Sequence, residues 1–145
     1  MNKSVIVIAI ALGAVVLMAA ACGSKTGTEG SVPTGKVIKA VPVENLTATL
    51  SNSTGQLKQG DQEVTLSFTD SSGKPVEVGA VSLNFHMPAM GGMSAMNDAV
   101  TFTTTSTPGV YRGRANISMA GEWQAQLAYE GPAGKGKATF SVTAR

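Results

Sequence analysis

Methionine is concentrated in one short segment of this 145-residue chain. Four of the seven methionines lie between Met87 and Met96, and the only histidine, His86, directly precedes them. The residues between these methionines are Pro, Ala, Gly and Ser, so the sulfur atoms are expected to be presented to solvent rather than packed in a core. Thioether sulfur is a soft, uncharged ligand that suits Cu(I). The sequence therefore predicts a copper site.

Strand geometry reduces the number of candidate Cu(I) ligands. A strand is predicted to end near His86, and successive side chains on a strand point to opposite faces. His86 and Met87 therefore cannot both bind one ion while the strand stays regular, and we assign Met87 to the core. Pro88 then begins a Gly-rich loop. The predicted ligands of Cu(I) are His86, Met90, Met93 and Met96.

Met119 is a weaker candidate ligand, as is Met87. Met119 precedes a predicted turn and could approach the loop from a neighbouring strand, with Trp123 covering a bound cation through its ring face. The alternative is that Met119 fills a gap in the core and that Trp123 is a buried aromatic residue.

Other chemistries lack the residues that they need. A single histidine cannot build a typical zinc site, and the His and Cys ligands of a blue-copper centre are absent. No Cys–His pair and no nucleophile elbow is present, so we expect no enzymatic activity. The net charge of +2, without a cluster of Lys or Arg, gives no indication of a nucleic-acid partner.

The beginning of the chain is typical of an export signal. Lys3 is followed by an apolar run over residues 5–17, which is short for a membrane span. The sequence Leu17-Met18-Ala19-Ala20-Ala21-Cys22-Gly23 resembles the lipobox of bacterial lipoproteins. That resemblance implies a signal peptide over residues 1–21 and acyl chains, such as palmitate, on Cys22. We therefore expect a protein of the cell envelope, lipid-anchored to a bacterial membrane and facing the periplasm or the exterior.

The remainder of the chain divides into a tether and one domain. Residues 22–41, which start with the lipidated Cys22, are rich in Gly and polar side chains and are expected to form a flexible linker. Residues 42–145 alternate apolar and polar side chains in short runs separated by Gly- and Pro-containing turns. The pattern predicts an all-β fold, an antiparallel immunoglobulin-like β-sandwich of about seven strands, with a small barrel as the alternative. The expected strands are 44–50, 63–69, 76–86, 99–105, 110–118, 122–129 and 137–143.

Three motifs within this domain resemble those of the YtkA-like family, which is related to FixH-type proteins. These motifs are Met87-Pro88-Ala89-Met90-Gly91, Gly109-Val110-Tyr111-Arg112-Gly113 and Ser118-Met119-Ala120-Gly121-Glu122-Trp123. The resemblance implies an exported β-sandwich module with a link to copper handling or oxidase assembly. Many relatives carry His among the loop methionines, whereas this chain has Met93 and Met96, which favours Cu(I) over Cu(II).

Two functions from different classes follow from these observations. The first is a membrane-tethered Cu(I)-binding protein that acts as a copper chaperone, scavenger or resistance factor, with a copper-donating or copper-accepting protein as its partner. The second is an interaction module whose Met loop binds a protein partner without metal, because flexible methionine side chains adapt to many surfaces.

Overall fold

The computed structural model describes residues 35–145, and within them the chain forms eight antiparallel strands and no helix. The predicted signal peptide, Cys22 and most of the predicted linker lie outside the described residues. No helix that could span a membrane is found in the described range. The strands are β1 (Lys36–Val43), β2 (Leu46–Asn52), β3 (Gly60–Thr69), β4 (Ala80–Met87), β5 (Met96–Thr104), β6 (Val110–Ile117), β7 (Gly121–Gly131) and β8 (Gly134–Ala144). The prediction of an all-β antiparallel fold is confirmed.

The first strand corrects the expected boundary of the linker. β1 begins at Lys36, inside the segment 22–41, and pairs with β2 from Lys36↔Asn52 to Val43↔Leu46. The domain therefore starts earlier than residue 42 and has eight strands rather than about seven. Val43 is the only residue of β1 that is buried. An edge strand with so little buried surface lacks the apolar alternation by which a strand is detected in a sequence.

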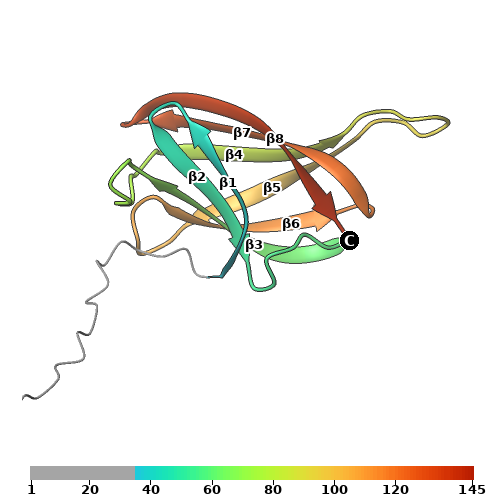
Figure 1. The fold of residues 1–145 in the computed structure, drawn as a ribbon, viewed down its shortest axis with the longest axis horizontal. Helices are drawn as coiled ribbons and strands as arrows, with labels where there is room; N and C mark the ends of the chain where they lie inside the picture. The colour runs from blue at the N-terminus through green and yellow to red at the C-terminus, as the bar shows by residue number, and fades with distance from the viewer. Residues whose placement is uncertain (1–34) are drawn as a thin grey trace, which may run out of the picture.

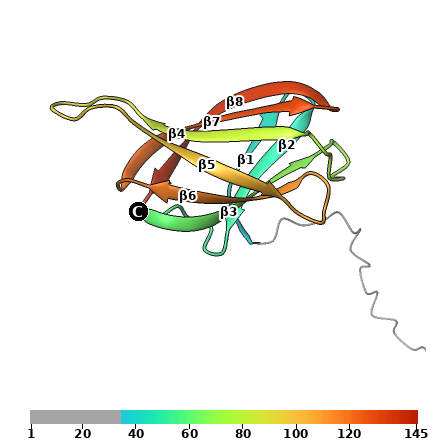
Figure 2. The same cartoon turned by 180° about the vertical axis from the view of Figure 1, so that it is seen from behind.

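All eight strands belong to one continuous sheet in the order β1-β2-β3-β6-β5-β4-β7-β8. β5 turns the corner of this sheet, because its residues 96–100 pair with β4 and its residues 101–104 pair with β6. The sheet thus folds back on itself, and its two edge strands, β1 and β8, come to lie in contact (Figures 1 and 2). The arrangement gives two face-to-face layers joined at β5.

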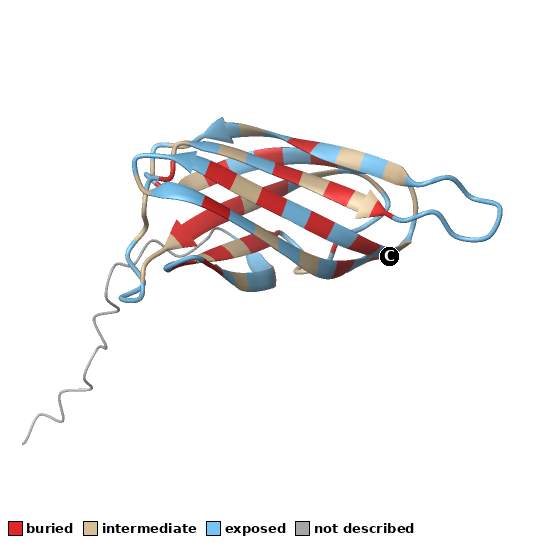
Figure 3. Cartoon of the chain, turned by 90° about the horizontal axis from the view of Figure 1, so that it is seen from above, coloured by how far each residue is buried: buried red, intermediate tan, exposed pale blue. Residues whose placement is uncertain are grey.

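One apolar core fills the space between the layers. Inward and outward residues alternate along most strands, which Figure 3 shows as alternating buried and exposed bands. The ring of Phe68 meets Tyr111 and Tyr129 edge-on, with ring centroids 6.0 and 5.3 Å apart. The largest fully buried side chains are Trp123, Phe68, Phe85, Leu50, Leu57, Leu66, Leu83 and Ile117.

Candidate metal site in the methionine hairpin

β4 and β5 form a hairpin whose tip projects well beyond the rest of the sheet (Figures 1 and 3). The two strands pair in one register up to Met87↔Met96, and the same register resumes at Met90↔Met93. The Met90 N–H donates to the Met93 carbonyl at 3.2 Å, and the Met93 N–H donates to the Met90 carbonyl at 2.9 Å. These two bonds close a turn of two glycine residues, so the segment expected to be a loop is a hairpin extension.

The tip of the hairpin places two exposed methionines opposite each other. Met90 is 63% exposed and Met93 is 49% exposed. Residues directly opposite each other in an antiparallel pair have Cβ atoms about 4.5–5.5 Å apart. A methionine side chain has three rotatable bonds beyond Cα and adapts readily, so the two sulfur atoms can converge on one ion without a change of the backbone.

A second methionine pair closes the regular ladder at the base of the hairpin. Met87 and Met96 are its last paired residues, and Met87 is only 4% exposed. Met96 is half-buried and packs against the core. Met87 therefore faces inward, as strand alternation predicted.

His86 lies on the outer face of the hairpin, opposite Asn97. The His86 Nδ1 atom is 2.9 Å from Asn97 Oδ1, which also accepts a hydrogen bond from Asn84 Nδ2 at 3.2 Å. An amide oxygen can only accept, so this contact is a hydrogen bond in the tautomer whose Nδ1 carries the proton. In the neutral ring, Nε2 then keeps its lone pair and can bind a metal ion.

The hairpin does not bring the four predicted ligands together. By strand alternation in the shared register, Met90 and Met93 fall on the same face as His86, whereas Met96 falls on the opposite face with Met87. His86 and Met90 are also four residues apart, which is about 13 Å along an extended strand. The geometry thus gives an exposed Met90–Met93 pair, with His86 further down the same face.

Met119 lies at the base of the same hairpin, in the turn between β6 and β7. The Met119 carbonyl accepts a hydrogen bond from Trp123 Nε1 at 3.1 Å, and the Met119 side chain is partly buried against the core. Trp123 is fully buried, so its ring is a core residue. The Met87 methyl lies 3.0 Å from the position that a Cβ on Gly121 would take, which places this turn against the base of the hairpin.

Sequence reasoning missed two polar contacts that shape this region. One is the contact of His86 with Asn97, which a hairpin centred on the two glycines would have predicted. The other is Asp98, whose carboxylate accepts hydrogen bonds from both the N–H and the hydroxyl of Ser118 at 2.8 Å. No pattern in the sequence pairs these two residues, because they belong to different hairpins.

The donors available for a metal are therefore mostly thioethers. Between residues 35 and 145, no three side chains of the types His, Cys, Asp or Glu lie close enough together to hold a metal ion. The methionine hairpin offers soft sulfur and one imidazole, a donor set that favours Cu(I) over Mg²⁺, Ca²⁺ or Zn²⁺.

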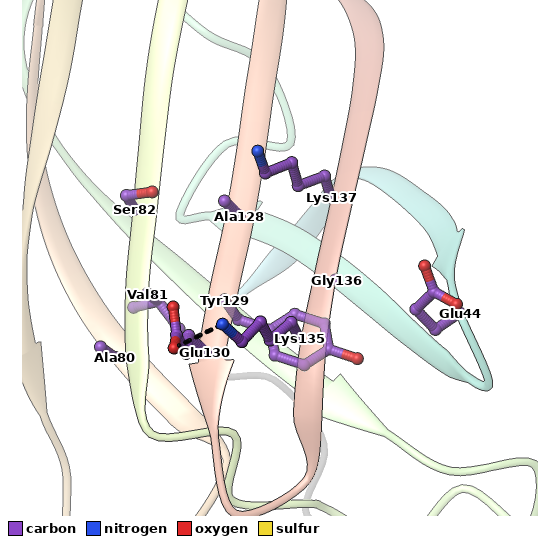
Figure 4. A pocket seen from close by; sticks show the side chains of 10 residues that line it. All are labelled: Glu44, Ala80, Val81, Ser82, Ala128, Tyr129, Glu130, Lys135, Gly136 and Lys137. Atoms are coloured by element: carbon purple, nitrogen blue, oxygen red, sulfur yellow. Dashed lines mark ion pairs between the residues drawn. The ribbon is translucent and has the colours of Figure 1, made fainter.

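A separate pocket of about 560 Å³ lies at the opposite end of β4 (Figure 4). Its lining comes from the first residues of β4, the adjoining parts of β7 and β8, and Glu44. An exposed ion pair joins Lys135 and Glu130 at its rim, with an N–O distance of 2.9 Å. The pocket contains none of the predicted site residues and no methionine, so it is unrelated to the soft-ligand chemistry.

Comparison with known proteins gives one match. A sequence model of the YtkA-like family matches residues 41–128. No curated protein and no solved structure matches the chain. The matched range runs from the end of β1 into β7, so it includes His86, the whole methionine hairpin and Met119.

Proposed function

The chain belongs to the YtkA-like family, and from that premise we propose that it is an exported, membrane-tethered protein that binds Cu(I) through its methionine hairpin. It serves as a copper carrier, in the role of a chaperone, scavenger or resistance factor. Lipidation at Cys22 holds it in the cell envelope of a bacterium, and its partner is a protein that donates or accepts copper.

The observation that carries this proposal is the exposed cross-strand pair of Met90 and Met93. Large apolar side chains normally avoid full exposure to water, yet these two stand at 63% and 49% exposure on a projecting hairpin. The hydrogen-bonded turn holds them opposite each other, so little ordering is needed when both sulfurs bind one ion. Thioethers are neutral and need no deprotonation before they bind a metal.

His86 supplies the additional donor in this proposal. Its proton is held on Nδ1 by Asn97, which leaves Nε2 free for the metal. The residues between the two methionine pairs, 88–89 and 94–95, are not paired in the ladder. A bend at this unpaired step would carry the tip toward His86 on the same face, and the ion would gain a third ligand.

A site of two or three ligands on an exposed tip suits a carrier. Cu(I) accepts three or four soft ligands, so a two-thioether site leaves coordination positions open to a partner protein. The ion can then pass from one protein to the other by exchange of ligands, without release into water. A storage site, in contrast, would enclose the metal.

Replacement of both tip methionines by leucine tests the proposal. Leucine keeps the apolar volume but removes the sulfur. Titration with Cu(I) against a competing chelator should show that Met90→Leu/Met93→Leu weakens binding at the tip by roughly tenfold or more, which corresponds to about 1.4 kcal/mol. His86→Gln should weaken it less. An unchanged number of bound Cu(I) ions, with unchanged affinity, in the leucine variant would show that the tip does not bind copper.

The same variant distinguishes Cu(I) binding from the second candidate function, which is a metal-independent interaction module. Val37, Met90 and Met93 are the large apolar side chains that stand exposed in the described part of the chain, so the tip is also an apolar patch. An interaction module should retain its partner in Met90→Leu/Met93→Leu and lose it in Met90→Ser/Met93→Ser. Retention should also be indifferent to copper and to chelators.

A further inference from the structure

Three methionines that the tip site does not use lie near the base of the hairpin. Met87 and Met96 are opposite each other in the last rung of the β4–β5 ladder, and Met119 lies in the β6–β7 turn. Met87 is buried, while Met96 and Met119 are partly buried against the same core. The three thioethers thus come from three different segments that end at one edge of the fold (Figure 1).

A set of hydrogen bonds and one close approach place the β6–β7 turn against the base of the hairpin. The Asp98 carboxylate, two residues beyond Met96, accepts hydrogen bonds from the N–H and the hydroxyl of Ser118, directly before Met119. On the other strand of the hairpin, the Met87 methyl lies 3.0 Å from where a Cβ on Gly121 would be. The absence of a side chain at Gly121 leaves room for Met87 beside the turn. One strand of the hairpin is therefore hydrogen-bonded to the segment that carries Met119, and the other strand lies close to it.

The surroundings of these sulfurs differ from those of an ordinary core methionine. Three neutral thioethers satisfy the coordination of a soft monovalent cation but do not balance its charge. Asp98 supplies a negative charge two residues from Met96, and its hydrogen bonds to Ser118 place the same charge beside the neighbour of Met119; Asp98 is itself half-buried. Partial exposure of Met96 and Met119 leaves a route by which an ion can enter from the hairpin side.

We propose that Met87, Met96 and Met119 form a second site for Cu(I), a three-thioether site at the base of the hairpin. This site goes beyond the proposed function, which requires only the exposed tip. Its three sulfurs and partial shielding from water make it the tighter of the two sites. The tip then captures the ion, and the base retains it.

Trp123, the only tryptophan of the chain, reports on this base site. Its indole N–H donates to the carbonyl of Met119 at 3.1 Å. An ion bound beside Met119 should change the fluorescence of Trp123, whereas an ion bound at the projecting tip should leave it unchanged. Ag(I) is the probe, since it has the same charge and ligand preference as Cu(I) without its redox chemistry.

The experiment is an Ag(I) titration of the full chain in mild detergent, read by Trp123 fluorescence and by NMR of the methionine methyl groups. The expected result is two Ag(I) ions per chain. Met90→Leu/Met93→Leu should bind one ion with the full change in fluorescence. Met96→Leu/Met119→Leu should bind one ion at the tip with no change in fluorescence, and its urea unfolding curve should match that of the wild type.

Two outcomes would overturn the base site and leave the tip untouched. One is binding of a single Ag(I), lost in Met90→Leu/Met93→Leu, with Trp123 silent throughout. The other is an unaltered fluorescence change in Met96→Leu/Met119→Leu. If Met96→Leu/Met119→Leu is less stable than the wild type, Met119→Leu alone decides the matter: the fluorescence response to Ag(I) should weaken by roughly tenfold in concentration or more, and an unweakened response would exclude Met119 as a ligand.

Discussion

Asp98 and Ser118 are joined by hydrogen bonds in which one carboxylate accepts both the backbone N–H and the hydroxyl of the same serine. Asp98 belongs to the strand that leaves the methionine hairpin, and Ser118 begins the turn that carries Met119. At this point β5 has not yet begun to pair with β6, because that pairing covers only Thr101–Thr104 on β5. The Asp98 side chain therefore joins β5 to the end of β6 where the backbone hydrogen bonds between these strands are absent.

Loss of this bridge should loosen the base of the hairpin. We predict that Asp98→Ala lowers the free energy of unfolding by about 1–3 kcal/mol, because hydrogen bonds to a charged acceptor are stronger than neutral ones. Urea unfolding followed by Trp123 fluorescence measures the change. Asp61→Ala is the matched control, since its carboxylate accepts one bond from the exposed Asn116 side chain. An effect of Asp98→Ala no larger than that of Asp61→Ala would contradict the bridging role.

Tyr111 should make the fold sensitive to alkaline pH. Burial, and then the hydrogen bond that its hydroxyl donates to Glu77 at 2.9 Å, raises the pKa of Tyr111 above its usual value. The unfolded chain ionises its tyrosine first, so the stabilisation is fully present below a pH of about 10 and is lost as the pH rises through the folded-state pKa. The free energy of unfolding should fall less steeply above a pH of about 10 in Tyr111→Phe than in the wild type. Urea unfolding at a pH of about 8 and a pH of about 10.5 measures this change. An equal loss of unfolding free energy between the two pH values in the variant and the wild type would contradict the prediction.

Tyr129 provides a comparison for that measurement. Burial also raises the pKa of Tyr129, and the negative charge of Glu44 adds to the effect. In Tyr129→Phe the free energy of unfolding should therefore also fall less steeply with pH above about 10. This variant does not lose a hydrogen bond of the kind that Tyr111 makes with Glu77. At neutral pH, Tyr111→Phe should be the less stable of the two variants by about 1 kcal/mol.

The sequence predicted the fold class and the burial of Met87, because both follow from strand alternation. The sequence does not predict the form of the methionine segment, because Pro88 and the glycines are also typical of a pliable loop. A Gly-Gly pair flanked by strands is itself a hairpin signal. A register centred on that pair would have placed Met90 opposite Met93 and His86 opposite Asn97.

Other features depend on contacts that no local pattern encodes. The β1 segment is a strand because it pairs with β2, and it buries little surface of its own. The approach of Met119 to the hairpin depends on where β5 changes partner from β4 to β6, which is a property of the whole sheet. Sequence reasoning could therefore name Met119 as a ligand candidate but could not decide between that role and simple core filling.

The metal ions that stabilise the protein should be those that match its side-chain ligands. No group of three His, Cys, Asp or Glu side chains that could hold a metal ion occurs within residues 35–145, and we therefore predict that Zn²⁺, Mg²⁺ and Ca²⁺ do not bind tightly there. Thermal unfolding of the full chain should be unchanged by these ions. Ag(I) or Cu(I) at about one hundred times the dissociation constant of a site should add about 2.7 kcal/mol to the stability for that site. Equal stabilisation by Zn²⁺ would contradict soft-ligand binding, and the variant with leucine at positions 90, 93, 96 and 119 should show none with Ag(I).

Substitutions in the turn between the tip methionines can change the geometry of the hairpin without changing the metal ligands. Gly91 has a φ angle of 56° while Gly92 is not in the positive-φ region, the pattern of a type II′ turn with glycine at its first central position. A Cβ at either glycine would meet nothing within 4 Å, so the two sites differ in backbone conformation and not in space. Gly91→Ala should strain the turn by about 1–2 kcal/mol, whereas Gly92→Ala should be tolerated.

If the tip binds Cu(I) because the turn holds Met90 opposite Met93, Gly91→Ala should weaken the affinity by roughly tenfold and Gly92→Ala should leave it close to that of the wild type. Neither variant removes a ligand, and neither touches the core, so the fold of the rest of the domain should be unaffected. Cu(I) titration against a chelator, with the amide spectrum of the hairpin recorded beside it, measures both effects. An equal loss of affinity in the two variants, or none in either, would show that the two sulfurs bind without help from the turn.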